Sequence, residues 1–169
     1  HTALRLDKVE EVAYTGEKRL LNKFQYNVNS LRKRNSSTYD HWGYANFTGG
    51  GLTGHPRFTC GVRSSSGGVH FGYLEGESRE VDTVCNQFGM LKRIYYTERS
   101  FKEFEFESNR ALINGYDRFQ GGLRIKKIKE YESVSAKPLV TSYYYTNSNG
   151  KSSGVAFMND PYYLYPIYY

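Results

Sequence analysis

The sequence has few of the residues that build metal sites or membrane-spanning segments. Its 169 residues include only two Cys, two Met, four Pro and one Trp. There is no CxxC pair and no array of Cys and His, which argues against a zinc site. Long apolar runs are missing too, so neither a signal peptide nor a membrane span is predicted. Because the chain begins at His1 without a Met, we expect a processed product or an excised piece.

Aromatic residues supply most of the apolar surface, with 17 Tyr and 10 Phe. Such residues favour strands, and a Tyr can bury its ring while its hydroxyl stays in water. Seventeen Gly, with many Asn and Ser, supply turn residues. No long stretch shows the apolar spacing of a helix. The sequence therefore predicts an all-β protein, an antiparallel sheet or sandwich of hairpins.

Alternation of apolar and polar residues locates the strands. Phe104 and Phe106 alternate with three Glu residues over positions 103–107, a period of two that fits a half-buried strand. Segments with strand-like character are residues 4–14, 20–28, 90–97, 101–108, 123–132, 139–146 and 152–158. Leu123 and Ile125 are out of phase with Ile128, which predicts a β-bulge near Lys126-Lys127. A connection that contains Gly and Asn joins the strand-like blocks at residues 101–107 and 123–131, and Asn149-Gly150 predicts a further hairpin turn.

The chain divides into a β-rich domain over residues 1–159 and a Tyr- and Pro-rich arm over residues 160–169. Proline is excluded from central strands, so the arm is expected to be an edge strand or an extended segment. Residues 29–88 hold most of the Gly, Ser and Asn, and we expect a long loop with short strands in it.

Two Cys and two sequons favour an extracellular or cell-surface protein. Cys60 and Cys85 are separated by 24 residues, and outside the cell they would form one disulfide worth on the order of 3 kcal/mol. N-glycosylation sequons begin at Asn35 and Asn46. We expect export from this combination together with the Tyr-, Gly- and Asn-rich composition.

The formal net charge of +6 does not by itself indicate nucleic acid. The basic residues are scattered among acidic ones, whereas a nucleic-acid footprint concentrates positive charge. The nearest clusters are Arg32, Lys33 and Arg34, and then Arg124, Lys126, Lys127 and Lys129. We interpret both as solvated strand faces and loops.

The candidates for a catalytic or metal-binding site are weak. A carboxylate beside an imidazole can tune a general base, but Asp40 and His41 would face opposite sides of a strand. We expect them to form a turn with Trp42 packed beneath it. His55 and His70 lack the spacing of metal ligands. The sequence thus predicts no catalytic residue, no metal and no cofactor.

Three carboxylates, those of Glu103, Glu105 and Glu107, would lie along one strand face about 7 Å apart. A calcium site or a glycosidase would need such acids in a cleft. We favour a solvent-facing strand whose acids pair with lysines of a neighbouring strand, among Lys126, Lys127 and Lys129. Residues 64–68, Ser-Ser-Ser-Gly-Gly, resemble a phosphate loop in composition only and are expected to be a flexible loop.

Several segments taken in order resemble one family. They are YDHWGY at residues 39–44, GMLKRI at 89–94, FEFE at 104–107, GGLRIKKI at 121–128 and SSGV at 152–155. Together they resemble a conserved region of large exported Bacteroidetes proteins distantly similar to Rhs/YD-repeat proteins. The resemblance implies a β-rich extracellular segment without established catalysis. The chain departs from the family at residues 97–100, Thr-Glu-Arg-Ser, where family members carry a proline-and-glycine turn.

Tyrosines are the candidate contacts to a partner, because consecutive strand residues alternate between faces and cannot all enter one core. These residues are Tyr143, Tyr145, Tyr162, Tyr163, Tyr165, Tyr168 and Tyr169. The predicted function is that of a non-enzymatic structural or adhesive β-domain, acting by self-assembly or surface attachment, with a fibre subunit as one form. The alternatives are a carbohydrate-binding module, with glycans as partners, and a fragment of an Rhs-like shell.

Overall fold

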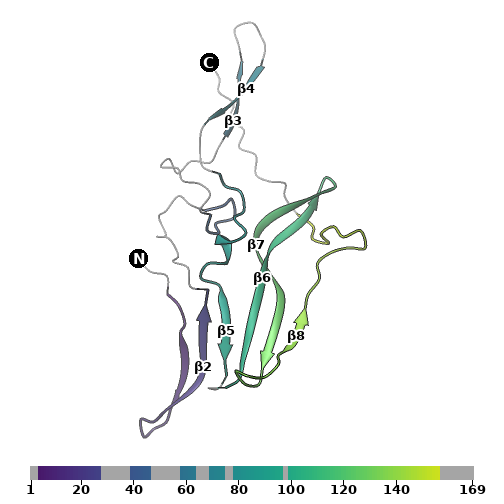
Figure 1. The fold of residues 1–169 in the computed structure, drawn as a ribbon. Coiled ribbons are helices and arrows are strands. Elements are labelled where there is room, and N and C mark those ends of the chain that lie inside the picture. The colour runs from purple at the N-terminus through teal and green to yellow at the C-terminus, as the bar shows by residue number, and fades with distance from the viewer. Residues whose placement is uncertain are drawn as a thin grey trace.

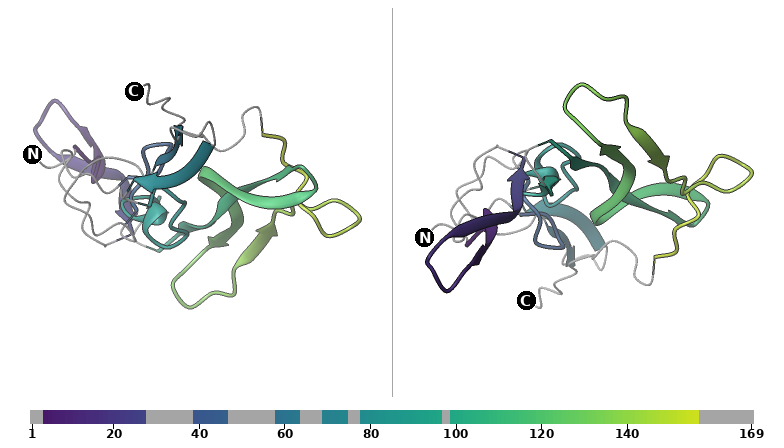
Figure 2. Two further views of the ribbon diagram at one scale, coloured as in Figure 1. Left: turned by 90° about the horizontal axis from the view of Figure 1, so that it is seen from above. Right: turned by 90° about the horizontal axis from the view of Figure 1, so that it is seen from below.

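The structure, a computed structural model, describes residues 4–27, 39–46, 58–63, 69–74, 78–96 and 99–156, with the backbone alone for 58–63 and 69–74. It confirms the all-β prediction. Six strands form one antiparallel sheet in the order β1-β2-β5-β6-β7-β8 (Figure 1). These strands are β1 (Lys8–Val12), β2 (Lys18–Tyr26), β5 (Leu91–Tyr95), β6 (Phe101–Ile113), β7 (Tyr116–Tyr131) and β8 (Leu139–Ser142). Seen from above and below, these strands follow a single twisted layer (Figure 2), and the sheet does not close into a barrel.

The predicted loop over residues 29–88 does carry short strands. β3 (Phe58–Arg63) and β4 (Val69–Leu74) form a separate two-stranded antiparallel sheet. The short 3-10 helix η1 (Cys85–Gln87) follows, and it contacts β7. Within the described ranges, no helix has the length and apolar character needed to cross a membrane.

The hairpin of β6 and β7 is the longest element and the centre of the sheet. Its turn contains Asn114 with φ of 50° and Gly115 with φ of 83°, the positive values that a tight hairpin turn needs. The register pairs Phe101 with Tyr131 at one end and Ile113 with Tyr116 at the other. The connection predicted to contain Asn and Gly is therefore the hairpin turn itself.

A β-bulge lies where the change of phase predicted one. Glu105 pairs with Lys127, but the next residue, Phe106, pairs with Ile125, so Lys126 has no opposite residue. The extra residue restores the phase, and Ile125 and Ile128 both lie opposite Phe residues of β6. The predicted bulge near Lys126-Lys127 is thus confirmed.

The register gives the sheet two chemically different faces. The apolar face carries two groups of paired side chains: Phe24 lies opposite Ile94 on β2 and β5, and Phe104 and Phe106 lie opposite Ile128 and Ile125 on β6 and β7. The residue of β6 opposite Ile94 is Lys102. The charged face carries Arg93, Glu103, Glu105, Glu107, Arg124, Lys127 and Lys129. At one end of the charged face, the ring of Phe101 stacks on Tyr131 with centroids 4.4 Å apart. Phe101 is one of only three buried hydrophobic residues in the described part of the chain, the others being Cys85 and Ala111.

The second predicted hairpin, around Asn149-Gly150, is shorter than expected. Its turn is present, because Asn147 Oδ1 accepts hydrogen bonds from the backbone N–H groups of Asn149 and Lys151. Pairing then stops after one bridge, between Thr146 and Ser152. Ser152 is instead tied to the central hairpin, since its Oγ donates to the carbonyl of Arg110 over 2.7 Å. The expected strands over residues 139–146 and 152–158 are therefore reduced to β8 and this bridge within the described residues.

Candidate functional site

The turn at residues 39–46 packs against the central hairpin through Trp42. A Cβ atom added to Gly121 of β7 would lie 2.1 Å from Cγ of Trp42, so the indole occupies the space above this glycine. At Gly122, whose φ is +89°, an added Cβ would lie 3.0 Å from the hydroxyl of Tyr44. Two segments far apart in the sequence, DHWGY and GGLRIKKI, therefore meet in the fold.

Asp40 holds this turn together, in agreement with the expectation that it is structural. Its Oδ1 accepts hydrogen bonds from the backbone N–H groups of Trp42 and Tyr44, at 2.9 and 2.8 Å. The residue is only 3% exposed, and its Oδ2 is buried without a hydrogen-bond partner. Burial raises the pKa of Asp40, although the backbone N–H groups oppose this effect. His41 lies edge-on to Trp42, with ring centroids 5.8 Å apart.

Asn46, one of the two predicted glycosylation sites, is a buried structural residue. It is 1% exposed, and its Nδ2 donates hydrogen bonds to the carbonyls of Ser78 and Glu80, at 3.0 and 2.6 Å. N-glycosylation would replace one of these donor hydrogens with a bulky sugar, so this geometry does not accommodate a glycan on Asn46. The other predicted site, Asn35, lies outside the described residues.

The disulfide between Cys60 and Cys85 stays a prediction. Cys85 begins η1 and is buried, at 8% exposed. The side chain of Cys60 in β3 lies outside the described part of the structure. No three side chains among His, Cys, Asp and Glu of the described residues are grouped so that they could hold a metal ion.

The three carboxylates of β6 are engaged by basic residues across the sheet. Glu103 pairs with Arg93 and, at 3.9 Å, with Lys129; Lys129 also pairs with Glu105. The hydrogen bond from Lys129 is the main reason that the pKa of Glu105 is lowered. Glu107 accepts a hydrogen bond from Nε of Arg124 at 2.7 Å. The predicted cross-strand pairing is thus found for Lys129, with Arg124 and Arg93 as the other partners.

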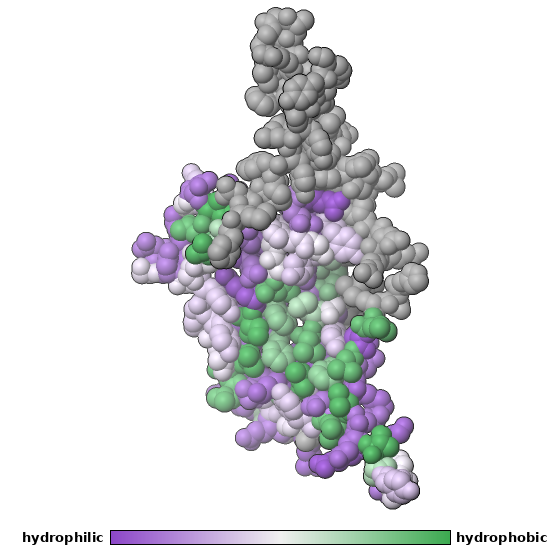
Figure 3. All heavy atoms as spheres, turned by 180° about the vertical axis from the view of Figure 1, so that it is seen from behind, coloured by the Kyte–Doolittle hydropathy of each residue, from purple (hydrophilic) through white to green (hydrophobic). Residues whose placement is uncertain are grey.

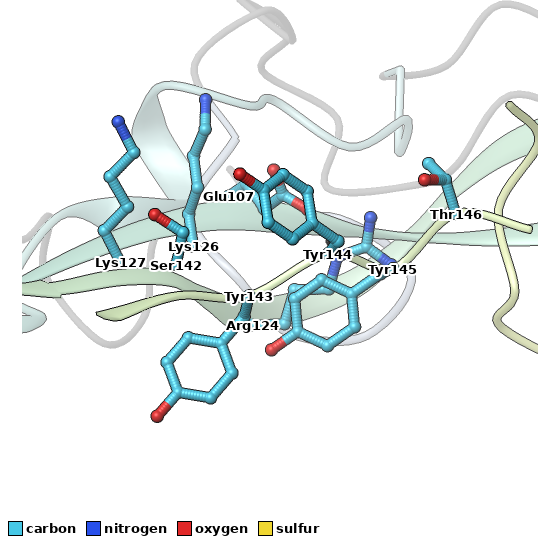
Figure 4. A pocket seen from close by; sticks show the side chains of 9 residues that line it. All are labelled: Glu107, Arg124, Lys126, Lys127, Ser142, Tyr143, Tyr144, Tyr145 and Thr146. Carbon is cyan, nitrogen blue, oxygen red and sulfur yellow. Dashed lines mark hydrogen bonds and ion pairs between the residues drawn. The ribbon is translucent and has the colours of Figure 1, made fainter. Parts of the chain in front are cut away.

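Lys126 and Lys127 are the basic residues left over on this face. Neither forms an ion pair with any described residue. The bulge at Lys126 places two consecutive lysines on the same side of the sheet, and their side chains extend in the same direction (Figure 4). Consecutive residues of a regular strand would point to opposite faces.

A shallow cavity of about 140 Å³ lies beside these lysines. Nine residues line it: Glu107, Arg124, Lys126, Lys127, Ser142, Tyr143, Tyr144, Tyr145 and Thr146. The cavity lies where β7 meets the end of β8, because the backbone N–H of Tyr143 donates to the carbonyl of Lys126. Of the residues that form it, the sequence drew attention to Glu107, Tyr143, Tyr145 and the basic residues of β7, but it did not bring them into one site.

The three consecutive tyrosines have different surroundings. Tyr145 is tied to the sheet: its hydroxyl donates to the carbonyl of Ile125 at 2.8 Å, and the Arg124 guanidinium lies 4.3 Å from its ring centroid. Tyr144 is 85% exposed and lies on the same side as the two lysines, whereas Tyr143 points to the other side (Figure 4). Of these three tyrosines, Tyr144 is therefore the most available to a partner. The predicted contacts Tyr162, Tyr163, Tyr165, Tyr168 and Tyr169 lie outside the described residues.

The apolar face of the sheet is a second surface of interest. Hydrophobic side chains gather over the sheet and are bordered by hydrophilic ones (Figure 3). The six side chains that define this face are all partly exposed, and none is buried. Periodicity predicted that Phe104 and Phe106 would share a face, but it could not show that no described strand packs over that face.

Comparisons of this chain with models of protein families, with curated proteins and with solved structures find no match.

Proposed function

We propose that the protein is a non-enzymatic, extracellular structural or adhesive domain that assembles with further copies of itself through the apolar face of its sheet. The observation that carries this proposal is the incomplete burial of that face. A sheet normally covers its apolar side with a second layer. Here Phe104, Phe106 and Ile128, at the centre of the sheet, keep part of their surface exposed.

Two further features support assembly. The outer edges of β1 and β8 have no strand beside them among the described residues, and unpaired edges are templates for another chain. In addition, the apolar face is flanked at one end by Lys102 and Glu130, which pair with each other at 3.3 Å. Charged residues around an apolar centre are the pattern of a protein interface.

A second copy is the occupant that this face fits best. Two copies stacked face to face would lie about 10 Å apart and would bury six large apolar side chains each, giving a sandwich from two single layers. Because the edges stay open in such a pair, further copies can join by strand addition. The resemblance to exported β-rich proteins agrees with an extracellular structural role.

The experiment is to measure the mass of the native particle by analytical ultracentrifugation, for the unaltered chain and for two variants. Ile128→Glu puts a charge on the apolar face, and Val140→Glu puts the same charge on the opposite face, where Val140 lies opposite Lys129. We expect assemblies for the unaltered chain and for Val140→Glu, and a folded monomer, checked by circular dichroism, for Ile128→Glu. A monodisperse monomer of the unaltered chain would refute the proposal.

Two measurements test the remaining parts of the proposal. Deletion of residues 160–169, which removes most of the predicted tyrosine contacts, is expected to reduce the order of the assemblies. A hydrolytic activity that His41→Ala abolishes would contradict the non-enzymatic role.

A further inference from the structure

We propose that the cavity between β7 and β8 binds an acidic saccharide, with Lys126 and Lys127 holding its anionic group and the ring of Tyr144 stacking on a sugar ring. This site is separate from the apolar face, because it lies on the charged face of the sheet. Saccharide binding at this site can therefore be tested independently of self-assembly.

The charge of the site favours an anion. The one carboxylate among its lining residues, that of Glu107, accepts a hydrogen bond from Arg124, and the carboxylate of Glu105, opposite Lys127, forms its ion pair with Lys129. Lys126 and Lys127 form no ion pair with any residue that the structure describes, and both line the cavity. Two adjacent ammonium groups repel each other, and an anion placed between them would relieve that repulsion.

The shape of the site favours a sugar ring. Tyr144, which is 85% exposed, lines the cavity together with Ser142, whose hydroxyl can both donate and accept hydrogen bonds. An apolar ring face beside polar groups matches a sugar, whose C–H face and hydroxyls lie on different sides. The cavity of about 140 Å³ is well below the roughly 300–1,000 Å³ of a pocket for a drug-sized ligand, so it fits one unit of a chain rather than a whole ligand.

Nucleic acid fits this site less well than an acidic saccharide. A nucleic acid needs a basic stripe that follows several phosphates. On the charged face, the other basic residues, Arg93, Arg124 and Lys129, are already engaged by the glutamates of β6. Two lysines that form no ion pair within the described ranges suit a ligand with one carboxylate or sulfate for each unit.

The bulge gives the site its geometry. Without Lys126 as an extra residue, only one of the two lysine side chains would lie on the charged face. The backbone beside them is fixed, since the carbonyl of Lys126 accepts a hydrogen bond from Tyr143 at 3.0 Å and that of Ile125 accepts one from Tyr145. The two ammonium groups are therefore carried by a braced segment of strand.

Isothermal titration calorimetry with a galacturonic acid hexamer tests the proposal, with a neutral galactose hexamer as the matched ligand. We expect binding of the acidic hexamer only, weakened roughly fivefold by Lys126→Gln or Lys127→Gln and by more in the double variant. Tyr144→Ala is expected to weaken binding by at least a similar factor. Lys18→Gln and Tyr14→Ala are the controls: both residues are exposed and lie near the β1–β2 turn, and neither is expected to change binding.

Three results would overturn the proposal. One is equal binding of the neutral hexamer; another is binding of the acidic hexamer that the lysine variants leave unchanged. The third is equal or tighter binding of a single-stranded DNA oligomer or a poly-glutamate peptide of matched charge, which would indicate a nonspecific polyanion surface. Circular dichroism of each variant excludes loss of folding as the cause of weaker binding.

Discussion

The indole of Trp42 lies against Gly121, so close that a single added methyl group would overlap it. Because Trp42 belongs to the turn at residues 39–46 and Gly121 belongs to β7, this contact joins a loop segment to the centre of the sheet. Within the hairpin itself, the side-chain amide of Asn109 on β6 donates to the carbonyl of Gly121 on β7 at 3.1 Å.

Gly121→Ala is expected to destabilise the protein by about 1–3 kcal/mol or more, because the new Cβ requires the indole to move. Chemical denaturation measures the change. In a Trp42→Ala background the same substitution should cost much less, so the double-mutant cycle should show a coupling energy above about 1 kcal/mol. Equal costs in the two backgrounds would mean that the contact with Trp42 is not the reason for glycine at this position.

Asn46→Ala is expected to lower the free energy of unfolding by about 1–3 kcal/mol, since it leaves the carbonyls of Ser78 and Glu80 without this donor. The same geometry predicts that Asn46 carries no glycan. Expression in a glycosylating host should give the same mass for the unaltered chain and for Thr48→Ala, which removes the sequon but keeps Asn46. A lower glycan mass in Thr48→Ala would contradict this expectation.

Asp40 should make stability depend on pH in the direction opposite to that of an ion-paired acid. Its pKa in the folded state is raised above the ordinary 3.8 by burial. Its contribution to stability is therefore complete at pH values below 3.8 and declines as pH rises through the folded-state pKa. Asp40→Asn removes this titration while Oδ1 can still accept from the N–H groups of Trp42 and Tyr44.

The measurement is the difference in unfolding free energy between the unaltered chain and Asp40→Asn over pH 3 to 7. The unaltered chain should lose stability relative to the variant as the pH rises. A difference that changes in the other direction would mean that the backbone hydrogen bonds to Asp40 outweigh its burial.

Much of the sheet could be predicted from the sequence because its signals are local. Alternation located β6, the Asn and Gly between β6 and β7 indicated their turn, and the phase of Ile125 against Ile128 predicted the bulge. These features depend on residues a few positions apart. The shortened pairing after Thr146 was missed because it depends on a distant contact, the hydrogen bond from Ser152 to Arg110.

The candidate sites were harder to predict because each joins distant parts of the chain. Tyr144 and Lys127 become neighbours through the pairing of β8 with β7, and the sequence alone does not give that register. The glycosylation sequon at Asn46 is a local pattern, but the two carbonyls that bury this residue come from residues 78 and 80. The local sequence pattern identified the residues with suitable side chains, and their tertiary contacts determine what each side chain can bind or carry.

Lys126, the extra residue of β7, has a consequence for how the protein can change. An even number of residues added to a strand keeps its inward and outward sides, whereas a single residue exchanges them. Deletion of Lys126 would remove the bulge and keep both faces, because Ile125, Lys127 and Ile128 would still lie opposite Phe106, Glu105 and Phe104. One further residue inserted beside Lys126 would make two extra residues, so regular alternation would keep Ile128 on the apolar face but move its pairing from Phe104 to Lys102. Deletion at this position therefore keeps the present pairing of β7, whereas insertion keeps the faces and changes the partners.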